Sequence, residues 1–211
     1  MARKEKPIPR QRRADGEASR TRILDAATEI AAERGYEGTS IGAVSAKCGL
    51  PASSIYWHFK DKDDLIAAVI ERSFAHWLKI WELPDDLVAR DRLMEVAAGT
   101  AKAVLNSPDF LRLGLMLALE RRPVEPRART MFVQVRSQAL DALSRSMRDL
   151  APGLTEEQLA QLATYAIAGA DGLFIAKEIG GASVDLIALF VLHGRSLYDA
   201  AVRMAEENER R

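Results

Sequence analysis

The sequence is poor in the features that mark secreted, membrane-spanning and disulfide-bonded proteins. A single cysteine, Cys48, among 211 residues excludes an internal disulfide and fits a reducing cytosol. The longest uninterrupted apolar runs, such as Leu186–Leu192, are far shorter than the roughly 18 residues that a membrane span needs. No apolar segment follows the charged N-terminus. We therefore expect a cytoplasmic protein with no signal peptide and no membrane partner.

The patterns that carry enzymatic or metal chemistry are also missing. The sequence has no Ser-His-Asp set and no glycine-rich phosphate loop. Its three histidines do not pair at i, i+4 spacing, and no second cysteine could complete a metal site. We therefore expect no catalytic residues, no cofactor and no metal.

Net charge is zero, but the charges are unevenly distributed. Residues 1–62 hold 12 Lys and Arg against 8 Asp and Glu, a net charge of +4, and the remainder carries −4. A basic N-terminal third beside an acidic remainder suggests a polyanionic partner for one end of the molecule.

Val, Ile and Thr never alternate with polar residues over the length of a strand, so the sequence predicts an all-α fold. Gly35, Gly49 and the Gly180-Gly181 pair are stop signals, and Thr155-x-x-Gln158 is a capping box that opens a helix. Predicted helices cover about 19–34, 40–48, 52–59, 62–83, 87–105, 108–119, 128–150 and 155–179, and a last one capped by Ser183 precedes a frayed tail at 206–211.

These boundaries suggest a flexible basic arm and two functional parts. Residues 1–16 are charged, contain proline and lack periodicity, which is typical of a flexible segment. Three helices follow in 17–62, and six longer ones in 63–211.

The stretch 39–59 (TSIGAVSAKCGLPASSIYWHF) is the most informative. Two short helices meet at Gly49, as in a helix-turn-helix unit whose second helix enters the major groove of DNA. The second helix offers donors that phosphates and base edges accept. The candidate DNA-binding residues are Ser53, Ser54, Tyr56, Trp57, His58, Lys60 and Lys62. An αα-corner with surface aromatic residues has the same pattern.

Residues 22–65 (RILDAATEIAAERGYEGTSIGAVSAKCGLPASSIYWHFKDKDDL) resemble the DNA-binding domain of the TetR/AcrR family of one-component transcriptional regulators. The run from Ile55 to Lys62 is close to the family signature, and the turns at Gly35-Tyr36 and Gly49-Leu50 match it too. The resemblance implies a homodimeric, all-α repressor of palindromic operators whose C-terminal domain binds a small molecule and then releases DNA. It also implies contacts to DNA by Tyr56, His58 and Lys62.

Two positions depart from the family pattern. Gly42 stands where relatives often carry a long polar side chain that reaches DNA, so base reading would fall on the second helix of the motif. Pro51 replaces the usual capping Ser or Thr, although its fixed φ suits the first turn of a helix.

The six later helices are expected to bind an apolar effector and to form the dimer. Large apolar residues that could line an effector pocket, or simply form core, are Trp77, Trp81, Met94, Phe110, Met116, Met131, Phe132, Tyr165 and Phe174. Small residues let two terminal helices per subunit form a four-helix bundle. The expected dimer residues are Ala166, Gly169, Gly172, Phe190, His193 and Leu197.

The function expected from these observations is DNA-binding transcriptional regulation, with repression relieved by a small apolar effector. Two alternatives stay open at this point. One is a ligand-independent DNA-binding or adaptor protein, and the other is an all-α enzyme with an apolar pocket.

Overall fold

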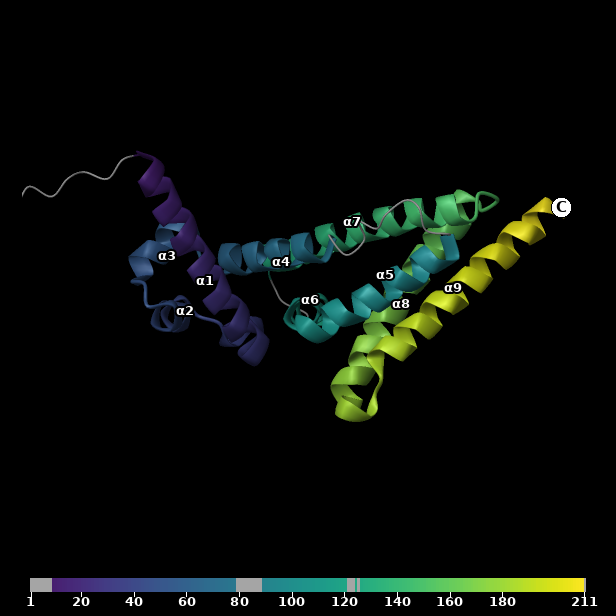
Figure 1. Ribbon diagram of the computed structural model, residues 1–211. Coiled ribbons are helices and arrows are strands. Elements are labelled where there is room, and N and C mark those ends of the chain that lie inside the picture. The colour runs from purple at the N-terminus through teal and green to yellow at the C-terminus, as the bar shows by residue number, and fades with distance from the viewer. Residues whose placement is uncertain (1–8, 79–88, 121–123, 125, 211) are drawn as a thin grey trace, which may run out of the picture. The chain divides into compact units, whose positions relative to one another are not determined.

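The computed structural model describes residues 9–78, 89–120, 124 and 126–210, and within these ranges the regular structure is entirely helical (Figure 1). The all-α prediction is therefore confirmed. The helices are α1 (Pro9–Gly38), α2 (Ile41–Cys48), α3 (Ala52–His58), α4 (Lys62–Leu78), α5 (Ala89–Asn106), α6 (Asp109–Leu119), α7 (Arg127–Leu150), α8 (Glu156–Gly180) and α9 (Leu186–Glu209), with a short 3₁₀ turn at Gly181–Ser183.

Three predicted ends were wrong. The arm is helical from Pro9 onward, because proline suits the first position of a helix and good helix formers follow it. The tail is helical to Glu209, where Asn208 bonds to Gln158 and to the Gly153 carbonyl. Asp185 rather than Ser183 caps α9, by accepting from the Ala188 N–H. The predicted residues 79–83 and 87–88 lie outside the described ranges.

The core of the first three helices follows the apolar spacing of the sequence. Ile23, Ala27 and Ile30 recur on one face of α1 and are fully or almost fully buried. They pack with residues of α2, α3 and α4, namely Val44, Cys48, Ile55, Leu65 and Val69. Burying each large aliphatic side chain contributes about 1.5–3 kcal/mol, so this cluster holds the small unit together.

The chain forms two compact units, Met1–Arg72 with Arg112–Phe132, and Ser73–Leu111 with Val133–Arg211. We call them the first and second units. This division differs from the expected boundary at 62/63. The reason is that α4 has no break there, and its Leu65 and Val69 belong to the core of the first unit.

In the second unit α8 and α9 lie side by side (Figure 1). Leu159, Leu162 and Ala166 of α8 pack with Leu197 and Ala201 of α9 in one buried cluster. Glycine allows closer approaches: a Cβ at Gly194 of α9 would lie 3.1 Å from the Ala97 side chain of α5. The confirmed capping box of Thr155 and Gln158 fixes where α8 begins.

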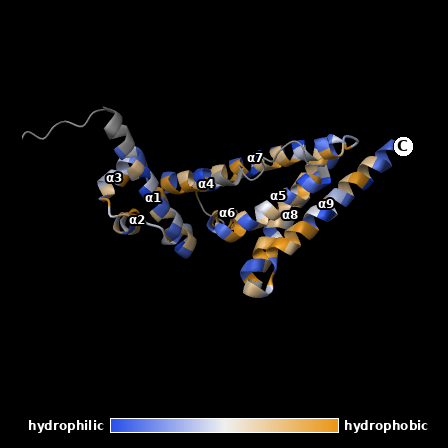
Figure 2. Ribbon diagram, viewed as in Figure 1, coloured by the Kyte–Doolittle hydropathy of each residue, from blue (hydrophilic) through white to orange (hydrophobic). Residues whose placement is uncertain are grey.

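Helix α8 is apolar around most of its circumference, and in Figure 2 the ends of α8 and α9 toward the turn that joins them are mostly orange. Length and composition alone would let the segment Glu156–Ser183 cross a membrane. Within the second unit one side of this helix packs against α9, and its Asp171 forms an ion pair with Arg136 of α7. Two parallel hydrogen bonds, of 3.1 and 2.6 Å, join that carboxylate to the guanidinium.

Candidate nucleic-acid interface

The turn between α2 and α3 is fixed by local contacts. Ser40 caps α2 by accepting from the Ala43 N–H, and Gly49 ends the helix with a φ of 67° that favours glycine. Arg22 of α1 donates to the Cys48 carbonyl at 2.6 Å, which ties the end of α2 to α1. Ile55 is fully buried and anchors α3 on the core. Helix α3 is thereby held with its opposite face toward solvent.

That outer face is rich in large aromatic side chains and donors. Tyr56 is 56% exposed and Trp57 is 76% exposed, although the other large apolar residues of α2 and α3 are buried or half-buried. Ser53 and Lys60 are exposed as well. Aromatic faces beside hydroxyl and ammonium donors suit contact with sugars, base edges and phosphates.

The first turns of α1 share this surface, which the sequence reasoning missed. A hollow of about 370 Å³ is lined by residues from both helices. From α1 they are Asp15, Gly16 and Ser19, and from α3 they are Ser53, Ser54, Trp57 and His58. Of the seven DNA-binding candidates, four therefore lie around one hollow. The helix-forming composition of 9–18 was the signal that could have extended α1 to this site.

Lys62 is partly engaged within the protein. Its ammonium donates to the Tyr36 carbonyl at 3.2 Å, lies 3.5 Å from the Glu37 carboxylate and stands 4.2 Å from the centre of the Tyr36 ring. The side chain is half-buried, whereas Lys60 is exposed. Lys62 therefore holds the start of α4 against the end of α1.

His58 sits where its charge state matters. Burial lowers the pKa of the imidazole, and the nearby Arg20 guanidinium lowers it further. The neutral form therefore dominates at pH 7, when the ring can donate one hydrogen bond and accept another. The Trp57 indole packs edge-on against it, with ring centres 4.6 Å apart.

The candidates for the effector pocket are dispersed. Phe132 packs against Gly114 and Met116 against Gly35, all within the first unit, which also contains Met131. In the second unit Met94 reaches Gly194, Phe110 packs on Phe74 with ring centres 6.1 Å apart, and Phe174 is buried. Tyr165 is 58% exposed on α8 and so lines no interior pocket. The Trp77 side chain and Trp81 lie outside what the structure describes.

Most of the expected dimer residues face the interior of their own subunit. Ala166, Phe190 and Leu197 are buried. His193 fills the space above Gly169, where a Cβ would lie 2.2 Å from the ring, and its Nε2 lies 2.9 Å from the Ala166 carbonyl oxygen. Only Gly172 is exposed. The dimer interface itself stays a prediction, but one chain already covers most of the residues expected there, because an all-round apolar helix does not reveal from sequence which side its own subunit covers.

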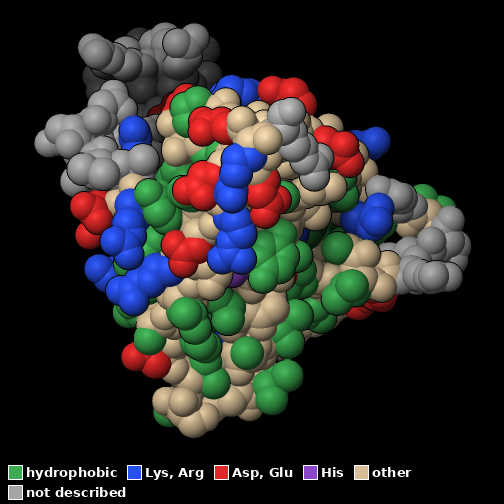
Figure 3. Space-filling view, turned by 90° about the vertical axis from the view of Figure 1, so that its right-hand side faces the viewer, with side chains coloured by type: hydrophobic (Ala, Val, Ile, Leu, Met, Phe, Trp, Pro, Cys, Tyr) green, Lys and Arg blue, Asp and Glu red, His purple; other side chains and the backbone are tan. Residues whose placement is uncertain are grey.

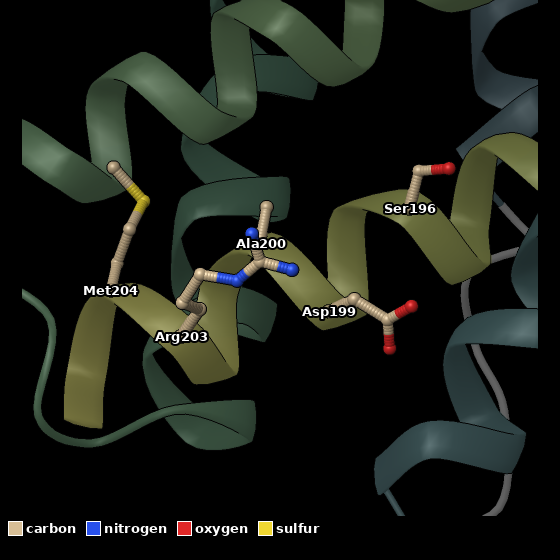
Figure 4. Close-up of a pocket in the computed structure, with 5 residues that line it drawn as sticks. All are labelled: Ser196, Asp199, Ala200, Arg203 and Met204. Atoms are coloured by element: carbon tan, nitrogen blue, oxygen red, sulfur yellow. The ribbon is translucent and has the colours of Figure 1, made fainter. Parts of the chain in front are cut away.

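A second hollow, of about 410 Å³, lies on α9 and is lined by Ser196, Asp199, Ala200, Arg203 and Met204 (Figure 4). All five residues come from one helix, so it is a surface feature and does not match the interior pocket expected from the sequence. Among the described residues, no three His, Cys, Asp or Glu side chains gather as a metal site would require.

Comparison with known proteins identifies the N-terminal part. Residues 23–69 match the family described as bacterial regulatory proteins, tetR family. The regulator AcrR of Shigella flexneri is 36% identical over 66 residues, a match that covers 31% of each chain. The chain thus matches about a third of the length of its curated relatives.

Solved structures extend the likeness in fold to most of the chain. SmeT, the repressor of a multidrug efflux pump of Stenotrophomonas maltophilia, aligns with a TM-score of 0.67 at 21% identity, over 88% of this chain and 91% of that one. FadR of Bacillus subtilis, in complex with stearoyl-CoA, gives 0.70 at 18% identity, over 87% and 98%. These relatives are transcriptional regulators, in agreement with the expectation that the chain is not an enzyme. Residues 23–69 therefore form a domain of the family described as bacterial regulatory proteins, tetR family, and the solved structures show the same fold for most of the chain.

Proposed function

We propose that the protein is a homodimeric transcriptional repressor that binds a palindromic DNA operator in the cytoplasm and is released by a small apolar effector. One observation carries the DNA-binding part. Helix α3 leaves Tyr56 and Trp57 in water although leaving large aromatic rings exposed is unfavourable. Hydroxyl and ammonium groups surround the two rings, so the surface suits a polyanion better than an apolar partner.

A second copy of the chain is the partner that we propose for α8. Tyr165, Ala168, Gly172, Ile175 and Ile179 are exposed and follow the 3-4-3-4 spacing of one helix face. Ile179 is 83% exposed and Ile175 44%. Figure 3 shows hydrophobic side chains on the surface of the lower part of this view, toward the α8–α9 turn. A self-complementary apolar face of this kind stabilises a two-fold dimer.

Dimerisation explains how the small α3 surface would gain specificity. Two copies of α3 related by a two-fold axis read two half-sites when they stand about 34 Å apart, one turn of DNA. We infer that residues 17–62 supply the DNA contacts and that residues 63–211 set their spacing. An effector bound in the second unit would release DNA only if it binds more tightly to a dimer whose spacing no longer fits.

The experiment is selection of duplexes from a random-sequence pool by the purified full-length protein. We expect enrichment of a palindrome with half-sites about one helical turn apart, protected by a dimer. Stearoyl-CoA, the ligand of the FadR structure, and free long-chain fatty acids are the first effector probes. The effector part holds if a probe raises the melting temperature and weakens binding to the selected duplex. It fails if stabilising probes leave that affinity unchanged.

A further inference from the structure

Among the described residues, the one that directly precedes helix α7 has no side-chain acceptor to cap it. Pro126 precedes its first residue, and a proline side chain has no acceptor for the free N–H groups of a helix start. The missing acceptor comes from α4. The Asp63 carboxylate accepts from the Arg127 N–H through one oxygen and from the Ala128 N–H, at 3.0 Å, through the other. A residue 64 positions earlier in the chain thus caps α7.

The neighbouring contacts extend this joint toward the DNA-binding surface. Asp64 accepts from the Arg127 guanidinium and, through its other oxygen, from the Lys60 N–H at 3.1 Å. The Tyr36 hydroxyl lies 3.2 Å from Asp63 and donates to it. Asp64 is only 23% exposed, which protects its bonds from solvent. Every one of these residues belongs to the first unit.

The arrangement departs from the ordinary role of acids at a helix start. Asp63 and Asp64 stand in the first turn of α4, where a carboxylate already interacts favourably with the dipole of its own helix. Here Asp63 also accepts from the Arg127 backbone N–H, and Asp64 accepts from the Arg127 guanidinium. The first turns of α4 and α7 therefore share the same two carboxylates. Order at the first turn of α7 and the position of the segment 60–62 therefore depend on each other.

We propose that Asp63 is a positioning residue which couples the first turn of α7 to the DNA-contacting segment that follows α3. The proposal rests on the proposed DNA binding. Coupling is reciprocal, so DNA bound at α3 must tighten the first turn of α7 even where it does not touch it, and loosening that turn must weaken DNA binding. A displacement of the first turn of α7 would then change the positions of Lys60 and Lys62.

The test is amide hydrogen exchange at Arg127 and Ala128, followed by NMR in the full-length protein with and without a duplex selected from the random pool. In the parent protein the duplex should slow exchange at both amides several-fold. In Asp63→Ala the same amides should exchange about tenfold faster without DNA, the scale expected when a helix cap is removed. They should no longer respond to the duplex, and duplex affinity should fall about three- to tenfold.

Matched variants separate coupling from general loss of stability. Asp141→Ala removes an exposed aspartate of α7 itself and should change neither exchange at 127–128 nor affinity. Asp63→Asn keeps one acceptor oxygen, so its amide exchange rates and its duplex affinity should lie between those of the parent and those of Asp63→Ala. The parent measurement needs no variant, so a poorly folded Asp63→Ala leaves the test intact.

The outcomes are distinct. If the parent binds no duplex in the pool, the proposed function fails. If it binds while exchange at Arg127 and Ala128 stays unchanged, or if Asp63→Ala still responds as the parent does, DNA binding stands and the coupling is refuted.

Discussion

Helices α3 and α8 both leave apolar side chains in water, but in different chemical settings. On α3 the exposed Tyr56 and Trp57 stand beside serine and histidine, with Lys60 just after the helix, whereas on α8 the exposed Ile175 and Ile179 continue a stripe of Gly, Ala and Tyr. The first mixture offers donors and ring faces, as a DNA-reading surface does. The second offers only shape and apolar area, as a subunit interface does. The neighbours of an exposed hydrophobic residue therefore indicate its partner better than its exposure alone.

The largest expected effect is loss of the proposed dimer in Ile175→Glu. A charge buried at the centre of an apolar two-fold interface is present twice and has no partner, which costs several kcal/mol. Sedimentation at micromolar concentration should show monomer, and affinity for a two-half-site duplex should fall by more than about a hundredfold, the gain that linking two half-sites provides.

Gln138→Glu, on the exposed face of α7, is the control and should stay dimeric. If Ile175→Glu is still a dimer, the interface lies elsewhere, and the exposed apolar stripe on α8 is not a subunit interface.

Two glycines of α8, Gly169 covered by His193 of its own chain and Gly172 exposed, sharpen the comparison. Gly169→Ala puts a methyl group 2.2 Å from the His193 ring and should destabilise the fold by about 1–3 kcal/mol, as overpacking does. Gly172→Ala meets nothing within 4 Å in its own chain and should leave the fold intact or stabilise it by up to about 1 kcal/mol.

Urea unfolding across a range of protein concentrations measures the stability changes of both glycine variants. The destabilisation of Gly169→Ala should be the same at every concentration, whereas any destabilisation of Gly172→Ala should appear only in the dimer dissociation constant. A concentration-independent destabilisation of Gly172→Ala would show that this face is not the interface.

The sequence revealed the elements and the recognition motif, because those depend on local signals. Caps such as Thr155 with Gln158 and the turn at Gly49 act within a few residues and were predictable. The buried side of α8 was not predictable, since Ala166 and Tyr165 are neighbours on an apolar helix and tertiary packing alone decides which is covered. The cap that Asp63 provides to α7 left no local signal either, because its partners are more than 60 residues away.

Lys60, which follows α3, and Ser53 of α3 should separate positioning on DNA from sequence reading. Lys60→Ala should weaken all duplexes alike. It should also flatten the plot of log affinity against log salt by about 0.9 per subunit for each phosphate that the missing ammonium no longer neutralises. Ser53→Ala should keep that slope and relax preference at one base pair per half-site, by about 1 kcal/mol or less.

Titrations of the selected duplex and of single-base variants at several salt concentrations make the distinction. The assigned roles are reversed if the serine change alters the slope and the lysine change alters base preference. If neither change affects binding, α3 does not read DNA.

The smallest expected effect is a pH dependence from His58, a group with no counterpart in the stripe on α8. Burial and Arg20 lower the pKa of His58 in the folded state, so the unfolded chain binds more protons at mildly acidic pH. Its contribution to stability is therefore present above the unfolded value of about 6.5 and is lost as pH falls below it. Urea unfolding at pH 5.5, 6.5 and 7.5 should show that His58→Asn loses less stability toward acid pH than the parent does.

For DNA binding the pH dependence has the opposite sign, because a nearby phosphate favours the protonated ring. The affinity of the parent should therefore rise from pH 7.5 to 6, and that of His58→Asn should rise less. Equal pH dependence in the two proteins would remove His58 from both the stability and the DNA argument, and would leave α3 to act through its aromatic, hydroxyl and ammonium groups alone.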